Sequence, residues 1–219
     1  MMAQEDGLLH GEVERKLKRE YLYSPVDPTR RTLDKILSIL NRFHEQGRDS
    51  RSLLQDVADA INRVFLIREV TIGLKDDSDG KYRYKVMSGS RPDTWRVYSE
   101  LSYTYEEFFD SRHYKGTQIS KYTSIFLTED NPYAEVDRDT ITHPILLTAK
   151  RAAVDDALEG DYLVIHIYGE KGELIGWMEI SGMKNGKLPK ATDLRWIELM
   201  ALIIGNAVVC EGRGAQNRR

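Results

Sequence analysis

The chain has 219 residues, which is enough for one domain with a well-buried core and a tail. Its 32 basic and 35 acidic residues leave a formal net charge of -3, so no summed field attracts it to nucleic acid or to an anionic membrane. The single cysteine, Cys210, excludes an intramolecular disulfide and a four-thiolate zinc site. We expect a cytoplasmic protein with neither nucleic acid nor membrane among its partners.

The first 28 residues are predicted to form a polar arm, with a short helix from Glu12 to Glu20. They carry no apolar run of the kind that a secretory signal or a membrane span requires. Pro25 and Pro28 interrupt helix formation, so we place the start of the main domain at residue 29. The domain is expected to extend to residue 210, and residues 211–219 to form a disordered polar tail.

Two helices are predicted to open the domain. Asp27 can cap the first, with Pro28 in its first turn, and Asp49 can cap the second. Apolar residues recur at helical spacing after each cap, which gives each helix one apolar face. These residues are Leu33, Ile36, Leu37, Leu40 and Phe43 on the first helix, and Leu53, Leu54, Val57, Ile61, Val64 and Phe65 on the second.

Alternating apolar residues predict two β-hairpins. The first pairs residues 70–74 with 82–86, and the second pairs 162–168 with 174–180 across a glycine-containing turn. Between the hairpins the chain is predicted to form a short helix opened by a capping box at Thr104–Glu107, a strand at 118–127, a surface loop at 128–138 and an amphipathic helix at 148–158.

A long helix that begins near Thr192 is predicted to close the domain. It is apolar on every side, so we expect its own sheet to cover one side and a second subunit to cover another. The protein is therefore predicted to be a homodimer that meets through the first and last helices of the domain. The candidate interface residues are Leu33, Ile36, Leu40, Phe43, Trp196, Leu199, Leu202 and Ile203.

The order of these elements over about residues 30 to 209 resembles the GAF domain, a small-molecule sensing module of signalling proteins. Gln118–Tyr122, Gly160–Asp161 and Gly186–Pro189 resemble, more narrowly, the GAF domains of archaeal and bacterial sensor histidine kinases, although no kinase domain follows Val209. The resemblance implies an α/β (α+β) fold. Its central, mainly antiparallel sheet would have five or six strands, with the N- and C-terminal helices on one face and a ligand lid on the other.

The resemblance also points to residues 95–143 as the lid. This segment is rich in aromatic rings with polar tips, which suit an apolar pocket that orients a ligand by a few hydrogen bonds, and which suit a plain core equally well. The candidate pocket residues are Trp95, Tyr103, Tyr105, Phe108, Phe109, His113, Tyr114, Tyr122, His143 and His166.

The function that follows is a cytosolic sensory or regulatory module. It would bind a small molecule and signal through a helical dimer interface to a partner protein. One alternative is a GAF-shaped dimerisation scaffold whose pocket has closed, and another is a haem or redox-cofactor sensor that uses His113, His143 or His166. The sequence identifies neither the ligand nor a cofactor.

Enzymatic activity is not expected, because no group of residues supplies both a nucleophile and a base. The acidic loop Asp76–Gly80 lacks the ligand spacing of a calcium-binding loop, and acidic residues before a glycine are common in turns. We therefore predict no metal site and no catalytic residues.

Overall fold

The structure is a computed structural model, and it describes residues 11–20, 27–46, 49–108, 114–132 and 149–216. The chain divides into two compact units, Met1–Lys35 and Ile36–Arg219, which are described separately. In the first unit residues 11–20 are helical, and helix α2 (Pro28–Gln46) begins there and continues into the second. The division therefore lies inside α2, whereas we placed the start of the domain at residue 29.

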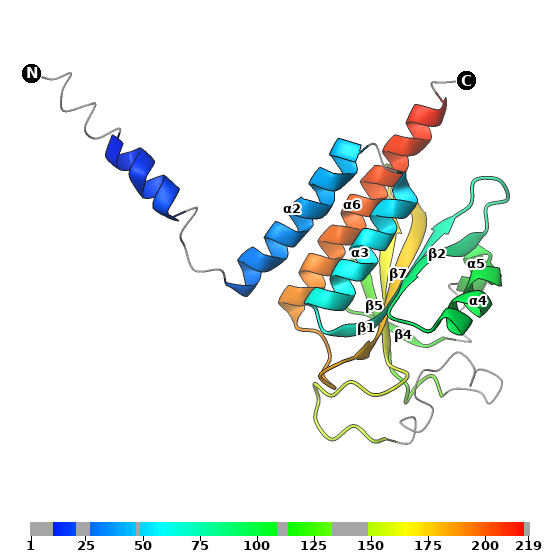
Figure 1. Ribbon diagram of the computed structural model, residues 1–219. Helices are drawn as coiled ribbons and strands as arrows, with labels where there is room; N and C mark the ends of the chain where they lie inside the picture. The colour runs from blue at the N-terminus through cyan, green and yellow to red at the C-terminus, as the bar shows by residue number, and fades with distance from the viewer. Residues whose placement is uncertain (1–10, 21–26, 47–48, 109–113, 133–148, 217–219) are drawn as a thin grey trace, which may run out of the picture. The chain divides into compact units, whose positions relative to one another are not determined.

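The second unit is built on one antiparallel sheet of seven strands in the order β3-β2-β1-β7-β6-β5-β4 (Figure 1). This confirms the predicted α+β fold with an antiparallel central sheet, and the short strands β3 and β4 account for the higher count. The strands are β1 (Ile67–Lys75), β2 (Tyr82–Ser88), β3 (Ser102–Tyr103), β4 (Gly116–Gln118), β5 (Thr123–Phe126), β6 (Tyr162–Tyr168) and β7 (Leu174–Met183).

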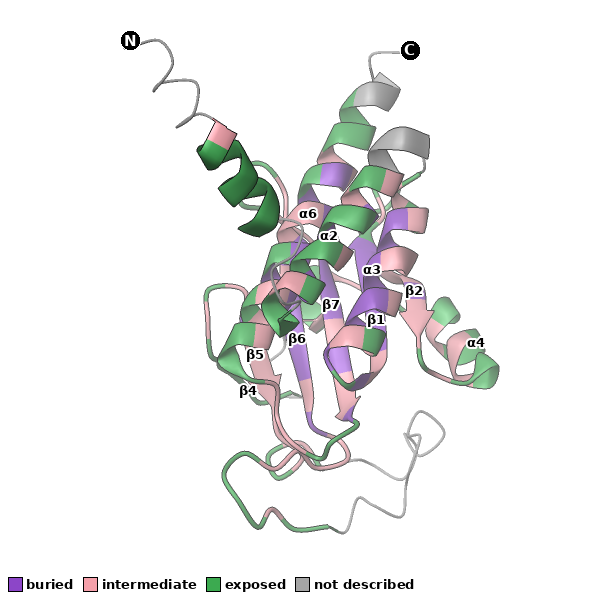
Figure 2. Ribbon diagram, turned by 60° about the vertical axis from the view of Figure 1, so that its left-hand side comes forward, coloured by how far each residue is buried: buried purple, intermediate pink, exposed green. Residues whose placement is uncertain are grey.

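Helices α3 (Ser50–Val64) and α6 (Ala191–Gln216) cover one face of the sheet (Figure 1). Their apolar stripes, which include Ile61 and Ile204, share one core with alternate strand residues such as Ile72. Figure 2 shows the buried positions concentrated on the central strands and on these helices. The predicted placement of the second and last helices of the domain on one face is confirmed.

From Ile36 onward, helix α2 packs on α3 and α6 of its own chain. Ile36 and Ile39 are 4% and 2% exposed and belong to the core. One apolar recess between the three helices is lined by Ile36, Ile39, Leu40, Val57, Met200 and Ile203.

The predicted helix caps are present. Asp27 accepts a hydrogen bond from a backbone N–H of the first turn of α2 at 2.7 Å, and Asp49 does the same for α3 at 3.0 Å. Thr104 and Glu107 form the capping box of the four-residue helix α5 (Tyr105–Phe108), because each side chain accepts from the other residue's backbone N–H. Short polar side chains thus fix where these helices begin.

The single strand predicted at 118–127 is wrong, because the segment forms the β4–β5 hairpin. The Ser120 hydroxyl accepts hydrogen bonds from the backbone N–H groups of Tyr122 and Thr123, at 3.1 and 3.0 Å, and closes a turn. A serine side chain that binds the backbone two or three residues later favours a turn over an extended strand.

The helix predicted at 148–158 is also wrong for the described residues 149–158, which are not helical. The Asp156 carboxylate accepts from the backbone N–H groups of Ala152 and Ala153, at 2.9 and 2.6 Å, and such side-chain bonds compete with helical ones. Of the loop predicted at 128–138, residues 133–138 lie outside the described part.

Two helical segments were not predicted. Helix α4 (Pro92–Glu100) begins with a proline, directly after the turn that ends β2. Helix α6 continues to Gln216, past residue 211, where we expected a disordered tail to begin. No helix in the described part of the chain has the length and apolar character needed to cross a membrane.

Candidate functional site

The face of the sheet opposite α3 and α6 carries the polar side chains of the central strands. On β7, Met178 and Ile180 point into the helix-side core, so the alternating Trp177, Glu179 and Ser181 point to the opposite face. Helices α4 and α5 lie on that other side, beside β2 and β3 (Figure 1).

Strand pairing arranges this face in rows. Antiparallel partners lie directly opposite each other, with Cβ atoms about 4.5–5.5 Å apart. Three rows cross the central strands β1, β7 and β6: Glu69–Ser181–Tyr162, Thr71–Glu179–Val164 and Gly73–Trp177–His166.

Trp177 is the centre of an aromatic cluster at one end of these rows. It is fully buried, and its ring lies over Gly73, where an added Cβ would be only 2.3 Å from the indole. Glycine at position 73 is therefore what lets the indole lie across β1. The rings around Trp177 lie with centroids 4.5 to 6.5 Å away and belong to Tyr82, Tyr84, Tyr103 and Phe108.

Two buried polar atoms on this face have no hydrogen-bond partner among the described residues. They are the Thr71 hydroxyl, on a residue only 5% exposed, and the Trp177 indole N–H. A buried polar group without a partner costs about 1–3 kcal/mol, and most such groups in proteins are satisfied. These two groups therefore make this sheet face the candidate site.

Glu179 lies directly opposite Thr71, in the middle row. Burial, followed by the nearby Glu69 carboxylate, raises the Glu179 pKa to about 7. Burial also raises the pKa of Tyr84 well above its usual value, with the Glu179 charge as the next cause.

Glu179 nevertheless keeps part of its surface accessible, although its row neighbours Thr71 and Val164 are buried. We call Glu69, Thr71, Tyr84, Trp177 and Glu179 the sheet-face site.

The structure separates the predicted pocket residues into groups. Tyr103 and Phe108 belong to the aromatic cluster around Trp177. His166 shares a row with Trp177, burial lowers its pKa, and its Nδ1 is 3.5 Å from the Tyr168 hydroxyl. Trp95 and Tyr122 are half-buried, Tyr105 and Tyr114 are each 52% exposed, and Phe109, His113 and His143 lie outside the described residues.

Sequence reasoning missed the residues of the sheet-face site. Its candidates were aromatic and histidine side chains, all of them in the middle segment except His166 on β6, whereas the unsatisfied and titratable groups lie on the central strands. A signal was present, because Glu179 is an acidic residue between Met178 and Ile180 in a strand with apolar residues on both sides of it. Without knowing what faces each side, that position looks like an ordinary solvent-facing residue.

Glu198 of α6 joins the helix to the β4–β5 hairpin. It is 4% exposed and accepts hydrogen bonds from the Thr123 hydroxyl at 2.8 Å, from Arg195 at 2.7 Å and from the Ser120 hydroxyl. Burial alone would raise the Glu198 pKa, but these hydrogen bonds outweigh it and lower the pKa. Glu198 therefore joins the β4–β5 hairpin to α6 by side-chain hydrogen bonds.

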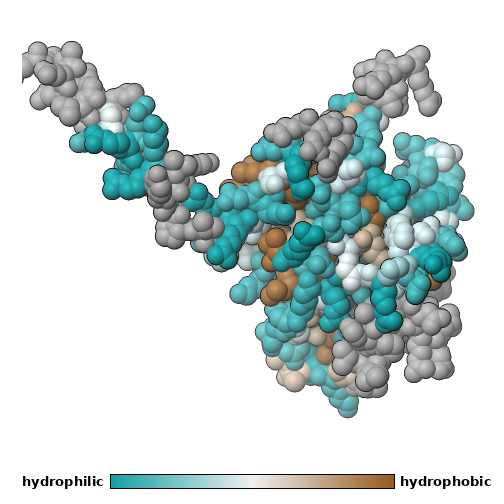
Figure 3. All heavy atoms as spheres, viewed as in Figure 1, coloured by the Kyte–Doolittle hydropathy of each residue, from teal (hydrophilic) through white to brown (hydrophobic). Residues whose placement is uncertain are grey.

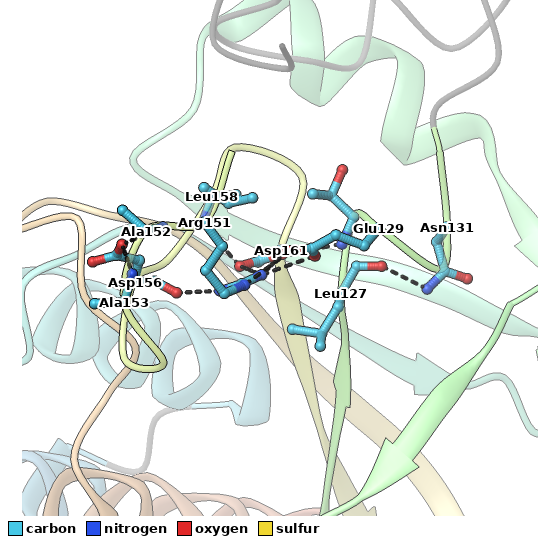
Figure 4. A network of polar contacts seen from close by, with 10 residues as sticks. Leu127, Glu129, Asn131, Arg151, Ala152, Ala153, Asp156, Leu158 and Asp161 are labelled. Carbon is cyan, nitrogen blue, oxygen red and sulfur yellow. Dashed lines mark hydrogen bonds and ion pairs between the residues drawn. The ribbon is translucent and has the colours of Figure 1, made fainter. Parts of the chain in front are cut away.

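A second network, around Arg151, joins the chain just after β5 to the chain just before β6 (Figure 4). Arg151 pairs with Glu129 through two hydrogen bonds of 2.9 and 3.0 Å, and with the buried Asp161 at 2.8 Å. Asp161 also accepts from the backbone N–H groups of Thr128 and Leu158. The two ends of the segment between β5 and β6 are therefore held together.

The candidate dimer residues differ in how far their own chain buries them. Ile36 is part of the core, and Leu40, Trp196, Leu202 and Ile203 are half-buried. Leu33 and Leu199 remain 42% and 39% exposed, and the side chain of Phe43 lies outside the described part. Apolar residues also show at the surface in the region of α2 and α6 (Figure 3).

No group of three or more His, Cys, Asp and Glu side chains in the described ranges is placed to hold a metal ion. The carboxylates of the acidic 76–80 loop are engaged locally. Asp76 accepts from Ser78 and Asp79 pairs with Arg83 at 2.9 Å. These bonds lower the pKa of both carboxyl groups.

Comparison with solved structures identifies the fold. The chain superposes on the GAF domain of a phosphoenolpyruvate-protein phosphotransferase from Coxiella burnetii with a TM-score of 0.53 at 15% identity, covering 84% of this chain and 96% of that domain. The GAF domain of a phosphoenolpyruvate-protein phosphotransferase from Acinetobacter superposes with a TM-score of 0.52 at 8% identity, covering 83% of this chain and 94% of that domain. The Stigmatella aurantiaca phytochrome photosensory core module superposes with a TM-score of 0.52 at 11% identity, covering 87% of this chain and 39% of that module.

Sequence comparison finds no matching family model and no matching curated protein. The structural matches nevertheless agree with the order of elements predicted from the sequence. The chain has the GAF fold.

Proposed function

We propose that this protein is a sensory module that binds a small organic molecule at the sheet-face site and reports its occupancy to a partner protein. The carrying observation is the pair of buried polar atoms without described partners, on Thr71 and Trp177, beside the titratable carboxyl of Glu179. A ligand that bonds these groups recovers the cost of leaving them unsatisfied.

A sensory role is also supported by the use of the same fold elsewhere. The Stigmatella match is a photosensory module, although at 11% identity the likeness concerns the fold alone. The ligand, the cytoplasmic location and the partner protein of this chain are parts of our proposal.

Signal transmission is proposed to run through α6. The Glu198 junction binds the β4–β5 hairpin to that helix, and the exposed Leu199 is the next residue along it. Ligand binding would favour one arrangement of the sheet-face elements and so change the packing of α6 at a homodimer interface.

One observation favours a second candidate, the ligand-free scaffold. Four aromatic rings pack closely around Trp177 and fill that end of the face, as they would in an ordinary core. Under this reading no ligand bonds the unsatisfied Thr71 hydroxyl, and its cost is borne by the fold.

The experiment that separates the two is a thermal-shift screen of the purified protein against cationic, neutral and anionic metabolites. A sensory module should be stabilised by at least one class. The stabilisation should shrink in Thr71→Val, which removes the hydroxyl and keeps the shape of the side chain, and in Trp177→Phe, which removes the indole N–H together with part of the ring. Glu14→Gln, at an exposed position of the N-terminal helix, serves as the control. Equal shifts in all variants, or none with any class, would favour the scaffold.

A further inference from the structure

The geometry points to a small organic cation as the ligand of the sheet-face site. We propose that a ligand ammonium group sits between Glu179 and Thr71 and that the rest of the ligand is aromatic or apolar. This inference rests on the proposed function and specifies the chemical class of ligand.

The first argument is the pairing of Thr71 and Glu179. They face each other across β1 and β7, so their Cβ atoms are about 4.5–5.5 Å apart. The Thr71 hydroxyl has no partner among the described residues, and it can accept a hydrogen bond as well as donate one. An ammonium group has three N–H donors, so it can bond the hydroxyl and the carboxylate at once.

The second argument is charge. The Glu69 carboxylate is near enough to Glu179 to disfavour the charged form of Glu179, and the three rows that cross the central strands contain no lysine or arginine. A cationic ligand would stabilise the Glu179 carboxylate, whereas an anionic ligand would destabilise it further.

The third argument is the aromatic surround. The Tyr84 phenol lies within electrostatic reach of Glu179 and also of Tyr98, Tyr103 and Tyr162. Aromatic faces attract cations, by about 0.5–2 kcal/mol or more when water is excluded. A carboxylate beside a tyrosine ring therefore matches an ammonium group on an apolar body, and the Trp177 N–H remains available to an acceptor on that body.

The test compares three probes of similar size, benzylamine, benzyl alcohol and benzoate, by saturation-transfer NMR with the full chain at pH 8. The pKa of Glu179 is about 7, so its carboxyl is mostly ionised there. We expect benzylamine to bind at least about tenfold more tightly than either isostere, because a charge-assisted hydrogen bond is lost in each.

Matched variants locate the binding. Glu179→Gln keeps the size of the side chain and should weaken benzylamine binding by about tenfold or more, and Thr71→Val by a smaller factor. Glu14→Gln should leave binding unchanged. Thermal unfolding of each variant confirms that it is folded.

The cation assignment is overturned if benzyl alcohol or benzoate binds as well as benzylamine, if Glu179→Gln does not weaken the amine, or if no probe binds at millimolar concentration. A neutral or anionic hit in the metabolite screen that depends on Thr71 would leave the sensory function standing and reject only the cation.

Discussion

At the scale of the residue, Glu179 makes stability depend on pH. Its pKa is raised from 4.5 to about 7, so between these values the folded protein binds more protons than the unfolded chain and stability falls as pH rises. Glu179→Gln imitates the protonated carboxyl. At pH 8 it should raise the free energy of unfolding by about 1–3 kcal/mol over the wild type.

Urea denaturation at pH 4.5 and pH 8 measures this effect. The gain should be present at pH 8 and nearly absent at pH 4.5, where the wild-type carboxyl is largely protonated in the folded state. A gain of the same size at both values would show that the substitution acts through packing and not through the proton.

Gly73 gives a second residue-scale prediction. A Cβ at this position would lie 2.3 Å from the Trp177 ring, which is fixed among its aromatic neighbours. Gly73→Ala should therefore cost about 1–3 kcal/mol, as overpacked cores do. Gly212→Ala is the control, because nothing lies within 4 Å of the added Cβ and alanine favours helix α6. If Gly73→Ala and Gly212→Ala changed the free energy of unfolding equally in chemical denaturation, the Trp177 ring would have to move aside without cost.

At the scale of the element, the Glu198 junction should hold the β4–β5 hairpin against α6. Thr123 is fully buried and its hydroxyl donates to Glu198, so Thr123→Val should cost about 1–3 kcal/mol and speed hydrogen exchange at the β4–β5 amides. Thr117→Val, at an exposed position of β4, should do neither. Unchanged hydrogen exchange in Thr123→Val would show that this hydrogen bond does not hold the hairpin against the helix.

The Arg151 network makes a separate prediction. Arg151→Met would leave the buried Asp161 carboxylate without its cation, which should cost about 3–5 kcal/mol. Arg96→Met, whose side chain is 78% exposed, should change the free energy of unfolding by less than about 0.5 kcal/mol. Similar small losses in both variants would show that Asp161 is satisfied by its backbone donors alone.

Most elements could be predicted because their signals are local. Asp49 starts α3, the Thr104–Glu107 box starts α5, and alternating residues mark the two long hairpins. The failures occur where one side chain decides against the local pattern, as Ser120 does for the β4–β5 turn and Asp156 does for the expected helix.

The candidate site was harder to predict for a different reason. Thr71 and Glu179 are more than a hundred positions apart in sequence and become neighbours only through the register of β1 and β7. Which face of β7 carries Glu179 also depends on where α3 and α6 pack. Spacing along the chain therefore cannot reveal the site.

At the scale of the whole molecule, the proposed dimer depends on the apolar surface of α6. Leu199 is 39% exposed, so Leu199→Glu should abolish a dimer that meets through this helix while leaving the core intact. Val154→Glu, at a residue 95% exposed outside the helices, is the control. Light scattering after size-exclusion chromatography measures the mass. A dimer that survives Leu199→Glu would place the interface elsewhere.

Native mass spectrometry of freshly purified protein is the most direct test of whether the sheet-face site holds a small molecule. We predict a non-covalent addition to the mass of the wild type that vanishes on denaturation and is reduced in Glu179→Leu but not in Glu14→Gln. A bare wild-type chain that also fails to bind any class in the metabolite screen, or an addition that both Glu179→Leu and Thr71→Val retain in full, would contradict the claim.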